Sequence, residues 1–123
     1  MTLLFHKYLE NSKGCIVNIS CMYGGRPNPG AIGYCMTKAG LEMLTKSSAL
    51  ELAPLGIRVN AVQAATIDTN LYRYTGMTES EYTNFKKRAS ANIPLQRIAT
   101  VEDVARAVIF LTSEQYFLFI YII

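Results

Sequence analysis

Two stretches of the sequence pair a tyrosine with a lysine four residues later. Tyr34 and Lys38 lie in "YCMTK", and Tyr82 and Lys86 lie in "YTNFK". On a helix, residues four apart share a face, so the ammonium group lies beside the phenol. The positive charge lowers the pKa of the tyrosine, which then exchanges a proton near neutral pH. The spacing also fits a core tyrosine followed by a lysine that pairs with Glu42, so it identifies no site by itself.

The elements around the first pair form a recognisable unit. Residues 15–20, "CIVNIS", are typical of a short buried strand, and residues 21–30 hold three glycines and two prolines, which predicts a loop. Apolar residues around most of the circumference predict a long helix over residues 32–53, and residues 57–63 predict the next strand. Strand, loop, helix and strand predict a βαβ unit with parallel strands, and therefore an α/β fold.

The second pair lies in a different setting. Thr78 and Glu81 have capping-box spacing and predict a helix to Ala91, and Thr100 predicts the start of a last helix. Ligands of open α/β sheets bind beyond the carboxyl ends of the strands, here the stretches after residues 20 and 63. The pair at 34 and 38 opens the helix at that edge, whereas no strand precedes the pair at 82 and 86.

Composition excludes several functions. The chain has 123 residues, half of them apolar, and a net charge of +3, which predicts a globular protein without a nucleic-acid surface. One histidine and three cysteines without ligand spacing predict no metal site. Residues 116–123, "YFLFIYII", predict a strand and are too short to span a membrane. No signal peptide is evident at the start, so we expect a cytoplasmic protein without membrane contact.

Several motifs in sequence order resemble one family. "GCIVNIS…YCMTKAG", "SALELAPLGIRVNAV", "IDTNL" and "IPLQRIATVEDVARAVIFL" together resemble the classical short-chain dehydrogenase/reductases, over residues 14–114. The resemblance implies a partial Rossmann-like doubly wound parallel sheet, made of the βαβ unit and C-terminal helices. It also implies NAD or NADP as cofactor, a small carbonyl or alcohol substrate, and transfer of a hydride between nicotinamide and the alcohol or ketone carbon.

The resemblance assigns roles residue by residue. Tyr34 matches the general acid/base, and Lys38 matches its partner, which also holds the nicotinamide ribose. Ile67 and Thr69 match the family's I-x-T, which contacts the nicotinamide carboxamide and the phosphates. Residues 70–91 correspond to the substrate lid. The long helix corresponds to one that packs against its copy, which implies a homo-oligomer through residues 32–53.

Two positions depart from the family pattern within the site. Cys21 stands where the family has the serine that orients the substrate carbonyl, and a thiol is a weak donor. The neighbouring Ser20 points to the other side of the strand if the strand period holds. Ala65 stands where the family has the glycine that lets the backbone approach the nicotinamide, and alanine restricts the backbone there.

The family's N-terminal half has no counterpart in the chain. None of the eight glycines gives G-x-G-x-x-G, so the adenosine and diphosphate site is absent, as is the tetrad asparagine. We therefore expect residues 1–123 to form a single, incomplete dinucleotide-binding-type domain that is inactive alone. The alternatives are a non-catalytic truncated relative that serves binding or assembly, and a truncated gene product without function.

Overall fold

A computed structural model describes residues 2–113 of the chain. These residues form two compact units, the first made of residues 2–63 with 107–113, the second of residues 64–106. Their elements are α1 (Thr2–Ser12), β1 (Cys15–Cys21), α2 (Ile32–Leu52), β2 (Arg58–Ala64), α3 (Glu79–Ala91) and α4 (Val101–Thr112), with 3-10 turns η1 (Met22–Gly24), η2 (Ala53–Leu55) and η3 (Asn70–Thr75). The strands predicted at 15–20 and 57–63, and the helices predicted at 32–53, up to Ala91 and from Thr100, are confirmed to within a few residues at each end.

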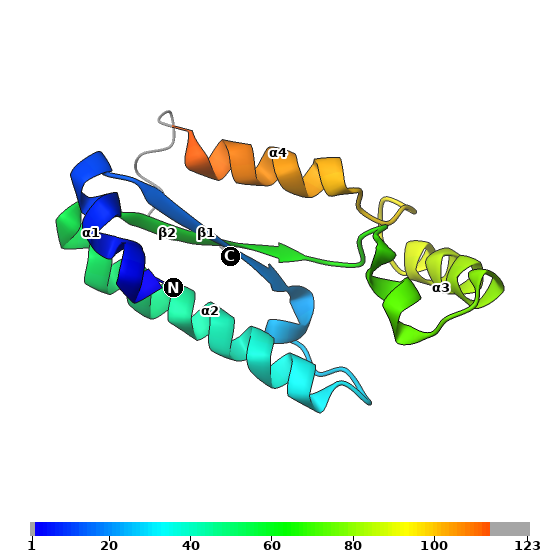
Figure 1. The fold of residues 1–123 in the computed structure, drawn as a ribbon. Coiled ribbons are helices and arrows are strands. Elements are labelled where there is room, and N and C mark those ends of the chain that lie inside the picture. The colour runs from blue at the N-terminus through cyan, green and yellow to red at the C-terminus, as the bar shows by residue number, and fades with distance from the viewer. Residues whose placement is uncertain (1, 114–123) are drawn as a thin grey trace. The chain divides into compact units, whose positions relative to one another are not determined.

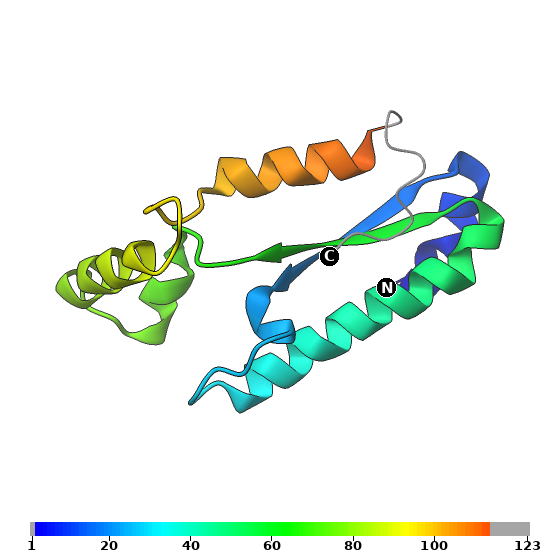
Figure 2. The same cartoon turned by 180° about the vertical axis from the view of Figure 1, so that it is seen from behind.

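The first unit is the predicted βαβ arrangement. β1 and β2 pair directly in a two-stranded sheet, and both strands run the same way in Figure 1. α2 lies along one face of this sheet, and the C-terminal end of α4 lies on the other, as the reverse view in Figure 2 also shows. A guanidinium N–H of Arg58 donates to the Leu111 carbonyl at 2.7 Å and ties that end of α4 to β2. Helices on both faces of parallel strands confirm a partial Rossmann-like α/β fold.

A small apolar core holds α2 on the strands. Ala49 of α2 packs with Ile57 and Val59, all three almost fully buried, and their partly buried apolar neighbours are Leu9, Ile16, Leu52 and Leu55. Full burial of an Ile or Val side chain stabilises the fold by about 1.5–3 kcal/mol. After α2 the chain turns at Gly56, whose φ of 75° favours glycine because it lacks a Cβ atom.

The surface of α2 that faces away from this core is unusually apolar. Ile32, Met36, Met43, Leu44 and Leu50 are all exposed on the isolated chain, Leu50 to 77%. The wide apolar circumference predicted for this helix is therefore present, and only part of it is covered within residues 2–113. An apolar surface of this kind is typical of a protein interface.

The second unit contains the loop after β2, η3, α3 and the start of α4. Thr78 and Glu81 form the predicted capping box at the start of α3. Ile67 pairs with Ala99 in an isolated parallel bridge, which fixes the loop after β2 to the segment before α4. The 3-10 turn η3 lies between this loop and α3.

The strand predicted at 116–123 lies outside the described residues. Among residues 2–113, no helix is long and apolar enough to cross a membrane. Over the same residues, no group of three His, Cys, Asp or Glu side chains is gathered in a way that could hold a metal ion.

Candidate active site

Tyr34 and Lys38 lie side by side on the first turns of α2. The Tyr34 side chain is 44% exposed, and the Lys38 Nζ atom lies 5.6 Å from the centroid of its ring. Lys38 Nζ also donates to the Ile19 carbonyl near the end of β1, at 2.9 Å. The strand therefore holds the ammonium group next to an accessible phenol, as the four-residue spacing on a helix predicted.

The alternative pairing of Lys38 with Glu42 is wrong. Glu42 Oε1 instead accepts a hydrogen bond from Ser20 Oγ at 3.0 Å, and both side chains are buried. Buried carboxylates need such partners because burial removes them from water. Lys38 Nζ instead contacts the Ile19 carbonyl and the Tyr34 ring.

The buried carboxyl group requires a glycine opposite it. A Cβ atom on Gly24 would collide with the carboxyl group of Glu42 and lie 3.1 Å from the Lys38 carbonyl oxygen. A side chain at this position would therefore have to displace the carboxyl group, which Ser20 holds by a hydrogen bond. The sequence indicated this glycine only as part of a loop, and it carries no local signal for this contact.

Alternation along β1 separates the serine from the cysteine. Asn18 donates to Thr45 Oγ1 at 2.9 Å and Ser20 donates to Glu42, so both side chains bond to α2. This agrees with a strand period of two residues. Cys21, the next residue, is a buried free thiol at the end of the strand. Ser20 is thus bonded to α2.

The loop after β2 carries the other predicted site residues in the second unit. Ala65 is exposed directly after β2. Ile67 is half-buried and bridged to Ala99, and Thr69 Oγ1 accepts from the Leu71 amide at 3.3 Å. The I-x-T segment is therefore bonded at Ile67 to Ala99 and at Thr69 to the start of η3.

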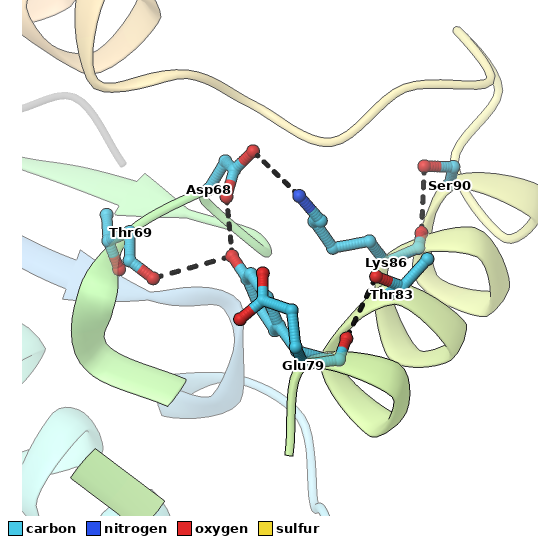
Figure 3. A network of polar contacts seen from close by, with 7 residues as sticks. Asp68, Thr69, Glu79, Thr83, Lys86 and Ser90 are labelled. Atoms are coloured by element: carbon cyan, nitrogen blue, oxygen red, sulfur yellow. Dashed lines mark hydrogen bonds and ion pairs between the residues drawn. The ribbon is translucent and has the colours of Figure 1, made fainter. Parts of the chain in front are cut away.

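The second tyrosine–lysine pair has a different environment, shown in Figure 3. Tyr82 donates from its hydroxyl to Asp68 Oδ1 at 2.5 Å, and Lys86 Nζ forms an ion pair with Asp68 Oδ2 at 3.3 Å. Burial of the phenol, followed by its hydrogen bond to Asp68, raises the pKa of Tyr82 to about 12. This phenol keeps its proton at neutral pH and is unsuited to acid/base work there.

Sequence reasoning missed the part played by Asp68. It lies between Ile67 and Thr69 in the I-x-T segment, at the variable position. The available signal was a carboxylate in that loop and a second tyrosine–lysine pair with no strand before it. Nothing local in the sequence joins the two, because they lie 14 residues apart or more.

Known proteins match this chain in sequence and in structure. Residues 1–118 match the family described as enoyl-(acyl carrier protein) reductase. The 3-oxoacyl-(acyl-carrier-protein) reductase of Rickettsia felis is 40% identical over 109 residues, which cover 89% of this chain and 43% of that protein. The chain thus spans less than half the length of this relative.

Solved structures give the same result. A short-chain dehydrogenase/reductase of unknown function from Caenorhabditis elegans, solved with cofactor, has a TM-score of 0.93 and 29% identity, over 100% of this chain and 48% of that one. ElxO with NADP bound has a TM-score of 0.80 and 32% identity, over 94% of this chain and 46% of that one. The chain therefore belongs to the classical short-chain dehydrogenase/reductase family.

Proposed function

We propose that this chain carries the proton-transfer part of an NAD(P)-dependent oxidoreductase site, which acts on an alcohol or ketone carbon. The observation that supports this most is the placement of the Lys38 ammonium group. The Ile19 carbonyl holds it beside the half-exposed phenol of Tyr34, on a helix that follows the carboxyl end of a strand. Ligands of α/β sheets bind at that end of the strands.

In this proposal Tyr34 gives its proton to the carbonyl oxygen during reduction and takes one from the alcohol hydroxyl during oxidation. The charge of Lys38 favours the phenolate form of Tyr34 and so assists both directions. A bound nicotinamide supplies or accepts the hydride. Cys21 takes the position of the residue that orients the substrate carbonyl.

Lys38 fits the ribose of the nicotinamide half of the cofactor, whereas Ala65 departs from the family's glycine. A lysine ammonium has three N–H donors, and Lys38 uses one on the Ile19 carbonyl, which leaves two for the ribose hydroxyls. By the family resemblance, Ile67 and Thr69 would contact the carboxamide and the phosphates. The sequence has no G-x-G-x-x-G, so it shows no evident site for the adenosine half.

We propose a small carbonyl or alcohol compound as substrate, with a 3-oxoacyl thioester as the first compound to test. The names of the curated relatives, which are 3-oxoacyl-(acyl-carrier-protein) reductases, favour this choice. We further propose that residues 1–123 act as a single, incomplete dinucleotide-binding-type domain in the cytoplasm. The exposed apolar face of α2 favours a homo-oligomer formed through residues 32–53.

A second candidate is a non-catalytic relative that serves binding or assembly through α2. Two observations favour it: the exposed apolar residues of that helix and the lack of any G-x-G-x-x-G in the chain. A truncated product without function is the remaining alternative. The oxidoreductase and the non-catalytic relative differ in whether the protein turns over a carbonyl substrate.

The test begins with the protein isolated from its own cells by an antibody to residues 34–53. Intact mass and NADH- or NADPH-dependent ketone reduction are then measured on the same sample. A mass about twice 13.7 kDa, the size of a complete doubly wound domain, together with turnover, supports the proposal. Replacement of Tyr34 by Phe should then reduce turnover by about 10²–10⁴-fold. The control Tyr8→Phe, at an exposed position on α1, should leave it unchanged.

The same experiment separates the alternatives. A mass near 13.7 kDa with no turnover favours the binding or functionless readings. Turnover that survives Tyr34→Phe contradicts the assigned proton donor, whatever the mass.

A further inference from the structure

Asp68 joins two segments of the second unit that carry different parts of the proposed site. Its backbone belongs to the loop with Ile67 and Thr69, and its side chain contacts α3, which lies in the lid segment 70–91. Both carboxylate oxygens are engaged, Oδ1 by Tyr82 and Oδ2 by Lys86. Figure 3 shows Lys86 reaching from α3 toward Asp68, with Thr69 next to it.

The backbone of the same loop is held by the segment that precedes α4. The Asp68 amide donates to the Ala99 carbonyl at 2.9 Å, and the Ala99 amide donates to the Thr66 carbonyl at 3.1 Å. The Tyr82 hydroxyl also lies 3.4 Å from the Thr69 carbonyl. Asp68 is thus the residue at which the backbone bridge and the contacts to α3 meet.

The two links from Asp68 to α3 differ in strength. Tyr82 is 4% exposed, and its ring stacks with Tyr72 and Phe85. The ion pair with Lys86 is more open, with Lys86 35% and Asp68 47% exposed, and ion pairs of this kind contribute little. A hydrogen bond from a buried donor to a charged acceptor contributes more. Tyr82 is therefore the main anchor, and Lys86 is a secondary one.

A hollow of about 500 Å³ borders this cluster. Its lining includes Asp68, Thr69, Tyr82 and Lys86, as well as Asn70 and Glu79. The cluster thus shapes the wall next to Thr69, the residue proposed to meet the nicotinamide.

We propose that Asp68 is a positioning residue, which fixes the loop of Ile67 and Thr69 against the lid helix α3 and so presents that loop to the nicotinamide half of the cofactor. This inference rests on the function proposed above. The second tyrosine–lysine pair of the sequence is then the anchor of a loop, while the first is the acid/base pair. The lid and the nicotinamide loop move together as long as Asp68 keeps its contacts.

The first test measures amide hydrogen exchange in the chain without ligand. The Ala99 amide reports on the loop because its hydrogen bond ends on Thr66, and the Asn92 amide, bonded to Ala89, reports on α3 itself. We expect Asp68→Asn and Tyr82→Phe to speed exchange at Ala99 by about tenfold, with little change at Asn92. Unchanged exchange at Ala99 in both variants overturns the proposal.

The second test titrates nicotinamide mononucleotide, which has the nicotinamide, the ribose and one phosphate without adenosine. We expect Asp68→Asn and Tyr82→Phe to raise its Kd by about tenfold, as loop ordering is lost, and Lys86→Met to raise it less. Lys7→Met removes an exposed lysine of α1, outside both the cluster and the lid segment, and should change nothing. Circular dichroism shows whether helix content is equal, because a loss of fold would lower it.

Together the two tests distinguish a failure of the Asp68 inference from a failure of the proposed cofactor function. Faster exchange with an unchanged Kd overturns the inference, because the loop then does not depend on Asp68 for binding. Absence of nicotinamide mononucleotide binding in the unaltered chain refutes the proposed cofactor function in this chain. The Ala99 exchange rates then still decide whether Asp68 positions the loop.

Discussion

Titration of the Tyr82 phenol tests the structure of the second unit directly. Burial and the hydrogen bond to Asp68 raise its pKa from 10.0 to about 12. The difference between these values corresponds to a preference of the folded chain for the neutral phenol of roughly 3 kcal/mol. Because the folded chain holds the proton more tightly than the unfolded chain, this contribution to the free energy of unfolding is complete below pH 10. It is lost as the pH rises from about 10 to about 12.

The assay is the near-ultraviolet absorbance of tyrosinate as a function of pH. The chain has eight tyrosines, so the curve of Tyr82→Phe is subtracted from that of the unaltered chain to isolate Tyr82. We expect the difference curve to have its midpoint near pH 12. Tyr74→Phe, at an exposed position, should leave that step in place. Circular dichroism at each pH shows whether the helices persist through the titration.

Asp68→Asn separates the two causes of the shift. The midpoint should move toward 10 without reaching it, because burial of the ring is the larger cause and remains. A Tyr82 midpoint near 10 in the unaltered chain would refute the buried, Asp68-bonded phenol. It would also remove the structural basis for Asp68 as a positioning residue.

Three further predictions concern the first unit. Gly24→Ala should lower the free energy of unfolding by about 1–3 kcal/mol, because the added Cβ atom collides with Glu42. Thermal melting measures this loss. Gly25 has open space around it, so the control Gly25→Ala should melt like the unaltered chain. Leu50→Glu on the exposed face of α2 should shift sedimentation from oligomer to monomer, and a chain that is monomeric before the change contradicts the proposed interface. Cys21→Ser, in a preparation that reduces ketones, should raise turnover because a hydroxyl donates more strongly than a thiol; unchanged or lower turnover means that Cys21 is not the counterpart of the family's serine.

Local sequence signals were sufficient for the helices and strands. Caps such as Thr78 with Glu81, and the glycine and proline residues that end α2, act over a few residues and are readable without the fold. The motifs at residues 14–20 and 34–40 likewise indicated the family, which the comparisons confirmed.

The sequence by itself determined the elements and the family, because local patterns and short motifs indicate both. It also determined that each tyrosine lies beside a lysine, because that depends only on the spacing of residues within one helix. Only the tertiary structure decided what surrounds each pair. Lys38 meets a strand carbonyl 19 residues before it, and Tyr82 meets a carboxylate 14 residues before it. The hydrogen bond from Ser20 to Glu42 likewise links residues that are 22 positions apart in the sequence. A phenol's proton affinity depends on burial and on neighbouring charge, and both are set by contacts between segments that are distant in the sequence.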